Sequence, residues 1–147
     1  MYLIFNSPYL TWYHQNNITN CSICLRRWAQ FRQISDQIEA NAKRLADGDA
    51  VNYREHIGGG YYVSITSGFL CIDVRRFCVP NGQTDVKPTR LGLAFRLPEW
   101  SAMKEIMEKI DATYTTLATA VPCILTESHM NQLGMINCHE CNPFDIM

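Results

Sequence analysis

The sequence predicts an α+β protein: a curved four-stranded antiparallel sheet followed by a long helix, with an extra helix on the N-terminal side. Two patterns carry this prediction. Apolar and polar residues alternate in short segments between residues 61 and 97, which is typical of half-buried strands. At residues 26–45 and 98–117 apolar residues recur every three or four positions, as on one face of a helix. With 147 residues, 47% of them hydrophobic, the chain can bury one core.

These patterns divide the chain into three regions. Residues 1–57 form an N-terminal extension with the first helix, which Gly48 ends. Residues 58–120 form the four-stranded sheet and its helix, and residues 121–147 form an irregular C-terminal appendage. The first helix opens with arginines, where the helix dipole disfavours positive charge. They serve either an external partner or a solvated helical face, and they are Arg26, Arg27 and Arg32.

Turn residues separate the predicted strands. Gly58-Gly59-Gly60 is a flexible lead-in to the sheet, and Ser67-Gly68 makes a tight turn between the first two strands. Pro80-Asn81-Gly82 marks the next turn. The four predicted strands cover residues 61–66, 69–77, 84–86 and 91–97.

The long second helix is expected to begin at Pro98, a residue that suits a first helical position. One helix over a four-stranded sheet buries little surface. The helix face turned away from the sheet is therefore expected to pair with a second copy of the chain, which predicts a homodimer.

Hydropathy and charge narrow the class of protein. No apolar run is long enough to span a membrane, and the apolar start is too short for a signal peptide and lacks its basic region. We therefore expect a soluble intracellular protein. The formal net charge is −1, yet residues 58–97 hold five basic and two acidic side chains, a net +3. This local excess is compatible with phosphate binding and also with an ordinary solvated surface.

Four short segments stand in an order that resembles one family. They are residues 62–65 (YVSI), 72–75 (IDVR), 87–90 (KPTR, followed by Gly92) and 97–100 (LPEW). Together with the predicted element order, they resemble the DNA-binding domain of transcriptional positive cofactor four, an RNA polymerase II coactivator that holds single strands. The resemblance covers roughly residues 57–117.

The resemblance implies a nuclear homodimer whose concave sheets bind single-stranded DNA or RNA and whose partners include the transcription machinery. In such sites basic side chains contact phosphates and aromatic rings stack on bases. The residues expected to bind nucleic acid are Arg75, Arg76, Lys87, Arg90, Arg96, Phe69 and Tyr62. Lys87, Arg90 and Arg96 surround the same surface of the predicted sheet as Arg75, and Phe69 and Tyr62 are candidate stacking rings. Arg75 falls at the family's DNA-contacting arginine. Without the resemblance, solvated charges that protect a sheet edge would explain Arg75 and Arg76 better than contact with DNA does.

Three departures from the family pattern fall on binding positions. The turn at residues 67–69 lacks the family's pair of lysines, Cys78 stands where a tryptophan stacks on DNA, and Leu91 replaces a lysine. Each lost phosphate contact weakens the salt dependence of binding. Either the affinity is lower than in the family, or Arg76, Arg90 and Arg96 replace these contacts.

Two Cys-x-x-Cys pairs predict a structural zinc site that clasps the two ends of the chain. Cys21, Cys24, Cys138 and Cys141 have the spacing with which two thiolates close on one tetrahedral ion. The ion would lie within one chain or between two chains, with His14, His129 and His139 as substitute ligands. Four unrelated thiols are the alternative. The remaining cysteines, Cys71, Cys78 and Cys123, are assigned to packing.

No arrangement typical of a catalytic site stands out, so the chain is not expected to be an enzyme. The segment Gly58-Gly59-Gly60 lacks the lysine and hydroxyl of a phosphate loop and precedes a strand. The main alternative to nucleic-acid binding is a dimeric protein-interaction module with a zinc clasp and little affinity for nucleic acid.

Overall fold

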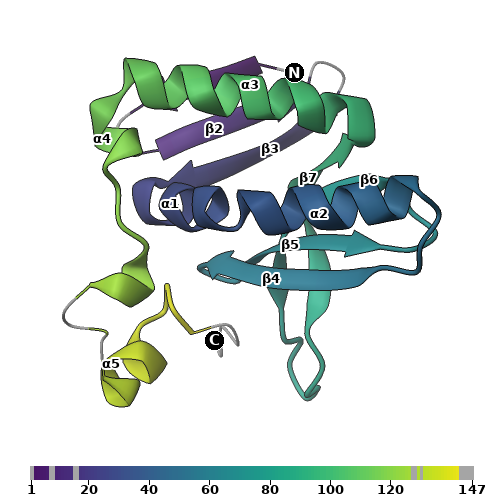
Figure 1. The fold of residues 1–147 in the computed structure, drawn as a ribbon. Helices are drawn as coiled ribbons and strands as arrows, with labels where there is room; N and C mark the ends of the chain where they lie inside the picture. Colours follow the sequence, from purple (N-terminus) through teal and green to yellow (C-terminus); the bar gives the residue numbers. More distant parts are fainter. Residues whose placement is uncertain (1, 7–8, 15–16, 127–128, 130, 143–147) are drawn as a thin grey trace.

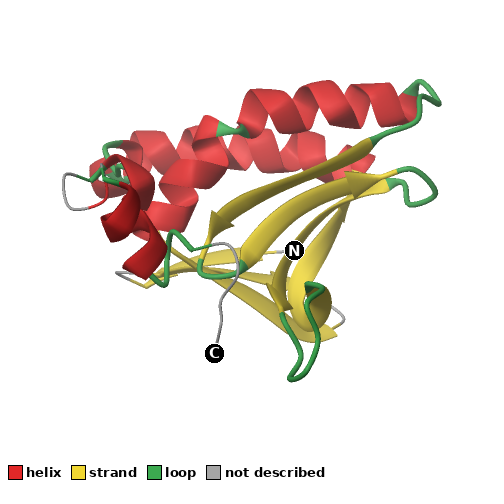
Figure 2. Cartoon of the chain, turned by 90° about the horizontal axis from the view of Figure 1, so that it is seen from below, coloured by secondary structure: helices red, strands yellow, loops and turns green. Residues whose placement is uncertain are grey.

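The computed structural model describes residues 2–6, 9–14, 17–126, 129 and 131–142. It is an α+β fold with helices on one side and two antiparallel sheets on the other (Figures 1 and 2). The strands are β1 (Tyr2–Asn6), β2 (Tyr9–His14), β3 (Asn17–Cys24), β4 (Asn52–Gly58), β5 (Tyr61–Thr66), β6 (Cys71–Cys78) and β7 (Lys87–Arg96). The helices are α1 (Leu25–Gln33), α2 (Ser35–Ala46), α3 (Leu97–Thr113), α4 (Thr115–Ala118) and α5 (Gln132–Asn137), with a 3-10 turn at Cys123–Leu125.

The second sheet confirms the predicted four-stranded antiparallel architecture, in the order β4-β5-β6-β7. Its membership differs from the prediction. Residues 84–86 lie in the loop between β6 and β7, because Pro80 and Gly82 keep residues 79–86 out of the ladder. The missing strand is β4, which comes from the region assigned to the N-terminal extension. Gly58-Gly59-Gly60 joins β4 to β5, and all three glycines have positive φ.

A three-stranded sheet, β1-β2-β3, precedes the helices and had no counterpart among the predicted elements. Both of its neighbouring pairs are antiparallel, and β3 leads directly into α1. β3 also contacts β7, the last strand of the second sheet. The N-terminal region is therefore part of the folded unit, and the boundary predicted at residue 57 does not separate it from the second sheet.

Both predicted helices are present, but each is interrupted. The first divides into α1 and α2 at Ile34, whose φ of −94° and ψ of 4° leave the helical range. The second divides into α3 and α4 at the extended residue Tyr114. The predicted irregular appendage contains the 3-10 turn and the short helix α5.

The core lies between the helices and the two sheets. Figure 1 shows α3 running beside α1 and α2. Phe31 of α1 and Trp100 of α3 make an edge-to-face contact with ring centroids 6.0 Å apart, and both side chains are buried. The helix face expected to pair with a second copy thus packs against helices of its own chain, which removes the physical reason given for a homodimer. The homodimer itself stays a prediction.

None of the helices in the described ranges has the length and apolar character needed to cross a membrane.

Candidate groove and metal centre

The second sheet has a core face and an open face. Because side chains alternate along a strand, Val63, Val74 and Leu93 point into the core, while Ser64, Asp73 and Ala94 belong to the opposite face. That opposite face is hollowed into a groove of about 760 Å³, which we call the sheet groove. Its lining comprises Arg54, Ser64, Thr66, Phe69, Cys71, Asp73, Arg75, Phe77, Val86, Pro88, Thr89, Arg90 and Ala94.

Arg75 is fixed in the sheet groove by its neighbours on β6 and β7. Its Nε donates to Oδ2 of Asp73 at 3.0 Å, and its Nη1 donates to the carbonyl oxygen of Thr89 at 2.8 Å. The side chain keeps 26% of its surface exposed. The guanidinium group is therefore held in place with part of its surface free for an anion, while Asp73 offsets some of its charge.

Gly92 allows the close approach of β7 to β6 at Arg75, its cross-strand partner. A Cβ atom at this position would lie 2.5 Å from the carbonyl oxygen of Val74 and 2.7 Å from Cα of Arg75. Both atoms belong to the backbone and cannot move aside independently. The pairing of β6 with β7 shifts register just beyond this pair, between Arg75 and Phe77, so a side chain at position 92 would force the two strands apart next to Arg75.

Aromatic rings pack beneath one part of the groove. The guanidinium of Arg54 lies over the ring of Phe77, 4.9 Å from its centroid. Phe77 in turn makes an edge contact with Tyr62 at 5.1 Å, and the ring of His56 lies 5.0 Å from Tyr62. Tyr62 is buried, and burial raises its pKa. Tyr62 therefore supports the groove and does not offer a ring for stacking.

Phe69 presents the most exposed aromatic ring of the groove. It follows the turn between β5 and β6, and 69% of its surface is accessible. Its neighbour Leu70 is 68% exposed. This exposure favours a surface role for Phe69 over packing in the core.

The structure divides the predicted nucleic-acid-binding residues among different surfaces. Arg75, Arg90 and Phe69 line the sheet groove, as does Arg54, which had not been predicted. Lys87 and Arg96 are exposed on β7, opposite Cys78 and Cys71 respectively. Arg54 was missed because the polar residues of β4 hid its strand pattern. Arg54 pairs with Ser64 across β4 and β5, so recognising β4 as a strand would have placed Arg54 on the groove face.

Arg76 lies away from the groove, in a second hollow of about 290 Å³ that also includes Arg27, Tyr61 and His139. Arg76, which was assigned to nucleic-acid binding together with Arg75, therefore does not share the sheet groove with Arg75. The cause is alternation along the strand, because consecutive residues on β6 point to opposite faces.

Cys123, His129, Cys138 and Cys141 form a possible metal-binding site, which we call the Cys/His cluster. Their ligand atoms all lie within 4.8 Å of one another. The Sγ atoms of Cys123 and Cys138 are 3.9 Å apart. Nδ1 of His129 lies 3.2 Å from Sγ of Cys123 and 3.4 Å from Sγ of Cys141.

These distances match a tetrahedral centre. With Zn–S bonds of about 2.3 Å, two thiolates on one tetrahedral ion lie about 3.8 Å apart, and a thiolate and an imidazole nitrogen about 3.5 Å apart. The donor set of three thiols and one imidazole is one of the sets found in structural zinc sites. Four donors of the correct type thus already lie near the positions that such an ion requires.

The Cys/His cluster includes only half of the predicted ligand set. Cys138 and Cys141 belong to it, but Cys24 lies outside it, with Sγ 3.7 Å from Oε1 of Glu140. The side chains of Cys21 and of the substitute His14 lie outside the described part of the structure. Cys123 had been assigned to packing and is instead a candidate ligand. His129, one of the three substitutes, takes the fourth position.

The thiols of the Cys/His cluster are not equivalent. Burial, followed by the neighbouring thiol of Cys123, raises the pKa of Cys141 to about 12. Burial also disfavours the thiolate of Cys138, but hydrogen bonds from the backbone of Cys141 and Glu140 outweigh it and lower the pKa of Cys138. A bound cation would favour the deprotonated form of each thiol.

Glu140, between two of the candidate ligands, fastens the cluster to the rest of the fold. Its Oε2 accepts a hydrogen bond from Nη2 of Arg27 at 2.8 Å, and its carbonyl oxygen accepts one from the N–H of Gly59 at 2.9 Å. Burial opposes the charge on Arg27, yet its contacts with Glu140 outweigh burial and raise its pKa.

The arginines that open the first helix thus bind other parts of the same chain. Nη1 of Arg26 lies 3.2 Å from Sγ of Cys123, Arg27 pairs with Glu140, and Arg32 forms an ion pair with Asp111 of α3 at 2.9 Å. An external partner is not needed to explain their positions.

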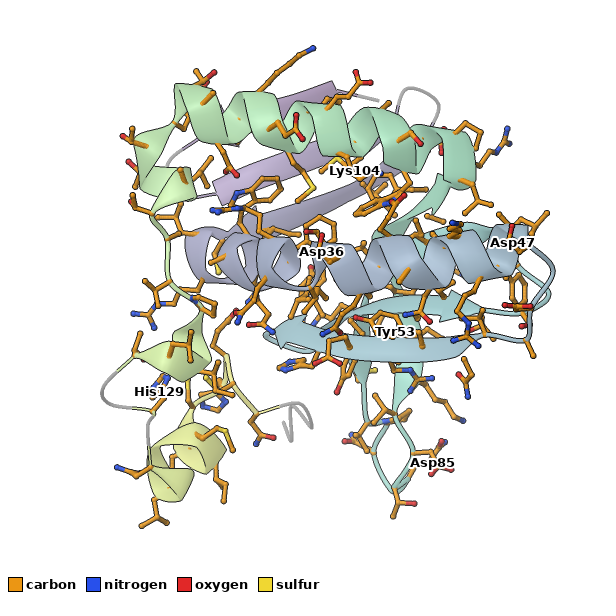
Figure 3. All side chains as sticks on the ribbon, viewed as in Figure 1. Asp36, Asp47, Tyr53, Asp85, Lys104 and His129 are labelled. Carbon is orange, nitrogen blue, oxygen red and sulfur yellow. The ribbon has the colours of Figure 1, made fainter. Side chains whose placement is uncertain are left out.

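Figure 3 places His129 beside α5, well separated from the loop that carries Asp85 at the far end of β6 and β7. The sheet groove and the Cys/His cluster are therefore distinct sites.

No protein-family model matches the chain, and no curated protein and no solved structure matches it either.

Proposed function

We propose that this protein binds single-stranded nucleic acid in the sheet groove and acts as an accessory factor in transcription or in DNA processing. The observation that carries the proposal is a concave sheet face on which Arg54, Arg75 and Arg90 line the same groove as the exposed ring of Phe69. Arginines that follow a phosphate backbone beside an exposed ring are the features by which unstructured strands are bound with little regard to sequence.

The groove favours single strands over duplex for a physical reason. An unpaired base exposes its flat face, on which Phe69 can stack, and such stacking is worth about 1–3 kcal/mol per base. In a duplex that face is covered by the neighbouring base pairs. The resemblance to positive cofactor four, which rests on residues of β5, β6, β7 and the start of α3, supports the same ligand class.

The affinity is expected to be modest. Three family contacts are replaced by residues without charge or ring stacking, and Asp73 places a carboxylate in the groove beside Arg75. Arg54 supplies one positive charge that the resemblance had not assigned to the groove. Binding should still weaken as the salt concentration rises, because the remaining arginines contact phosphates, but with a smaller slope than a groove with all the family contacts would give.

The test is a titration of a single-stranded and a duplex oligonucleotide at two salt concentrations, with wild-type protein and with Arg75→Ala. We expect the single strand to bind more tightly, and we expect Arg75→Ala to weaken its binding about tenfold, or about 1.4 kcal/mol. The salt slope should fall by about 0.7, the value for one phosphate contact on a single strand.

Arg44→Ala is the matched control for this titration. It removes the same charge from an exposed position on α2, where Arg44 contacts only Asp49 and the carbonyl oxygen of Ala50 among the contacts described. If Arg75→Ala and Arg44→Ala lost the same affinity for the single strand, the effect would come only from the change in net charge. Equal binding of single strand and duplex would contradict the proposal.

We further propose that the ion in the Cys/His cluster is zinc and that its role is structural. All four coordination positions can be filled by protein ligands, which is typical of structural sites and leaves no open place for catalysis. The ion would tie the 3-10 turn to the segment after α5, in a part of the chain with few buried residues of its own. Elemental analysis of the purified protein should find one zinc per chain.

A protein-interaction module remains the second candidate, because apolar side chains are exposed around the Cys/His cluster. Ile124, Leu125, Leu133 and Ile136 each expose 45% or more of their surface. A group of exposed apolar side chains beside a metal site is better suited to contact a protein surface than a nucleic acid. A module of this kind would ignore the oligonucleotides in the titration above.

A further inference from the structure

The two helical segments contact each other through two matching sets of polar bonds. Nε1 of Trp28 donates to Oδ1 of Asp111 at 3.5 Å, and Nε1 of Trp100 donates to Oε2 of Glu39 at 2.7 Å. The difference from 28 to 100 is 72, and the difference from 39 to 111 is also 72. The two hydrogen bonds are therefore equivalent under a shift of 72 residues: the two donors correspond to each other, and so do the two acceptors.

The ion pairs between the helices obey the same shift. Nε of Arg32 lies 2.9 Å from Oδ2 of Asp111, and Nζ of Lys104 lies 2.8 Å from Oε2 of Glu39. Arg32 and Lys104 are again 72 positions apart. The hydrogen bond from Lys104, together with that from Trp100, lowers the pKa of Glu39.

The apolar core continues this correspondence. Each helical segment follows a strand, β3 or β7, and these two strands contact each other. Leu25-x-x-Trp28 opens α1 and Leu97-x-x-Trp100 opens α3. Five buried pairs are related by the same shift: Ile23 and Phe95, Trp28 and Trp100, Phe31 and Met103, Ile38 and Ile110, and Leu45 and Leu117.

Reciprocal contacts of this kind define a two-fold interface. When residue i of one unit contacts j of the other, and j of the first contacts i of the second, the two units are related by a two-fold axis. Here both units belong to one polypeptide. One unit runs from β1 to α2 and the other from β5 to α4, with β4 added to the second sheet.

The two units differ in charge. Residues 1–25, which include the whole first sheet, contain no aspartate, glutamate, lysine or arginine. The second sheet carries the arginines of the sheet groove. Phosphate binding depends on lysine and arginine, so of the two sheets only the second has the residues for it.

From these observations we infer that the chain is an internal duplication that acts as a monomer and binds one nucleic-acid strand. The first unit supplies the helix partner that the second unit would otherwise take from another chain, and the second unit supplies the binding groove. The duplication stands on the helix contacts alone, whereas the number of strands bound rests on the proposed function.

The first test measures the helix pairing without nucleic acid. Light scattering should give the mass of one chain, 16.9 kDa. The midpoint of chemical unfolding should be the same over a hundredfold range of protein concentration, because the stability of an interface between chains depends on concentration by mass action. Glu39→Gln should lower the midpoint equally at every concentration. A dimer whose midpoint rises with concentration would overturn the inference that the chain acts as a monomer with its helices paired internally.

The second test counts strands. Native mass spectrometry and calorimetric titration with a short single-stranded oligonucleotide of mixed sequence should give one strand per chain, and Arg75→Ala should weaken that one site. Two strands per chain would contradict the assignment of binding to one unit. Absence of any bound strand would contradict the proposed function, while the mass and unfolding results would still decide the duplication.

Discussion

The charge that the sheet groove offers to a phosphate depends on one carboxylate. Asp73 holds Arg75 in place and at the same time neutralises part of its charge. The resemblance assigned Arg75 to nucleic-acid binding, and Arg75 lines the sheet groove. It could not show that Asp73 and Arg75 bind each other, since residues two apart on a strand pair only when their rotamers and neighbours allow it.

Replacing Asp73 with asparagine should therefore strengthen binding. We expect Asp73→Asn to raise the affinity for a single-stranded oligonucleotide about two- to fivefold, because a partly exposed ion pair is worth about 0.5–1 kcal/mol. A fluorescence anisotropy titration measures the change. Asp47→Asn, at the exposed end of α2, changes the net charge equally and should have little effect. Weaker binding by Asp73→Asn would show that positioning of Arg75 matters more than its free charge.

The cluster ligands show what residue patterns cannot reveal. The pair Cys138 and Cys141 has a spacing that indicates metal binding, and it lies in the cluster. Cys123 and His129 are separated from each other by five residues and from that pair by the chain of α5. Cys123 and His129 join the cluster only through tertiary folding. Cys24, although it belongs to a Cys-x-x-Cys pair, lies outside the cluster and contacts Glu140.

At the scale of elements, the periodicity of strands and helices predicted most of the second sheet and both helical segments. β5, β6 and β7 have clean alternation and were found. β4 was missed because three of its seven residues, Arg54, Glu55 and His56, are polar in succession, which hides the alternation. The interruptions at Ile34 and Tyr114 were missed because the apolar period continues across both.

Gly92 is the element-scale feature that most directly links sheet geometry to the groove. We expect Gly92→Ala to lower the free energy of unfolding by about 1–3 kcal/mol, because the added methyl group meets backbone atoms of Val74 and Arg75. It should also weaken oligonucleotide binding by displacing Arg75. Urea unfolding and the anisotropy titration measure the two effects.

Leu91→Ala is the control for this variant. Leu91 is the preceding residue and is 48% exposed, so its truncation should change stability by less than about 0.5 kcal/mol. A Gly92→Ala variant as stable as the wild type would contradict the close packing of β7 against β6 at this position.

At the scale of the whole molecule, the C-terminal segment that carries the Cys/His cluster contacts α1 and the turn between β4 and β5. If the cluster holds the proposed ion, removing that ion should release this segment and leave the sheet groove in place, because the two sites are separate. We expect a chelator, or Cys141→Ser, to lower the thermal midpoint and to expose residues after Pro122 to proteolysis. Oligonucleotide binding should stay within about twofold of the wild type, a difference near 0.4 kcal/mol.

Cys78→Ser is the matched control for the cluster. Cys78 is partly buried on β6 and does not belong to the cluster, so its loss should leave metal content and protease resistance unchanged. A chelator that has no effect on the wild type would contradict a structural role for the ion. A chelator that abolishes oligonucleotide binding would show that the two sites are coupled.

The duplication could in principle have been read from the sequence. Leu-x-x-Trp occurs at residues 25–28 and 97–100, and the apolar pattern that follows is similar in both segments. The strands before them differ in length and charge, and the loop between β6 and β7 has no equivalent between β2 and β3. The repeat is therefore visible mainly in the helices, where the shared interface restricts which side chains fit.

The exposed stretch at residues 47–50, between α2 and β4, connects the two units. A backbone nick there would leave two fragments, each carrying one helix of the reciprocal pair. Such halves should recombine spontaneously when mixed, so this scaffold is suited to complementation reporters in which reassembly of a severed polypeptide signals that two attached cargoes have met.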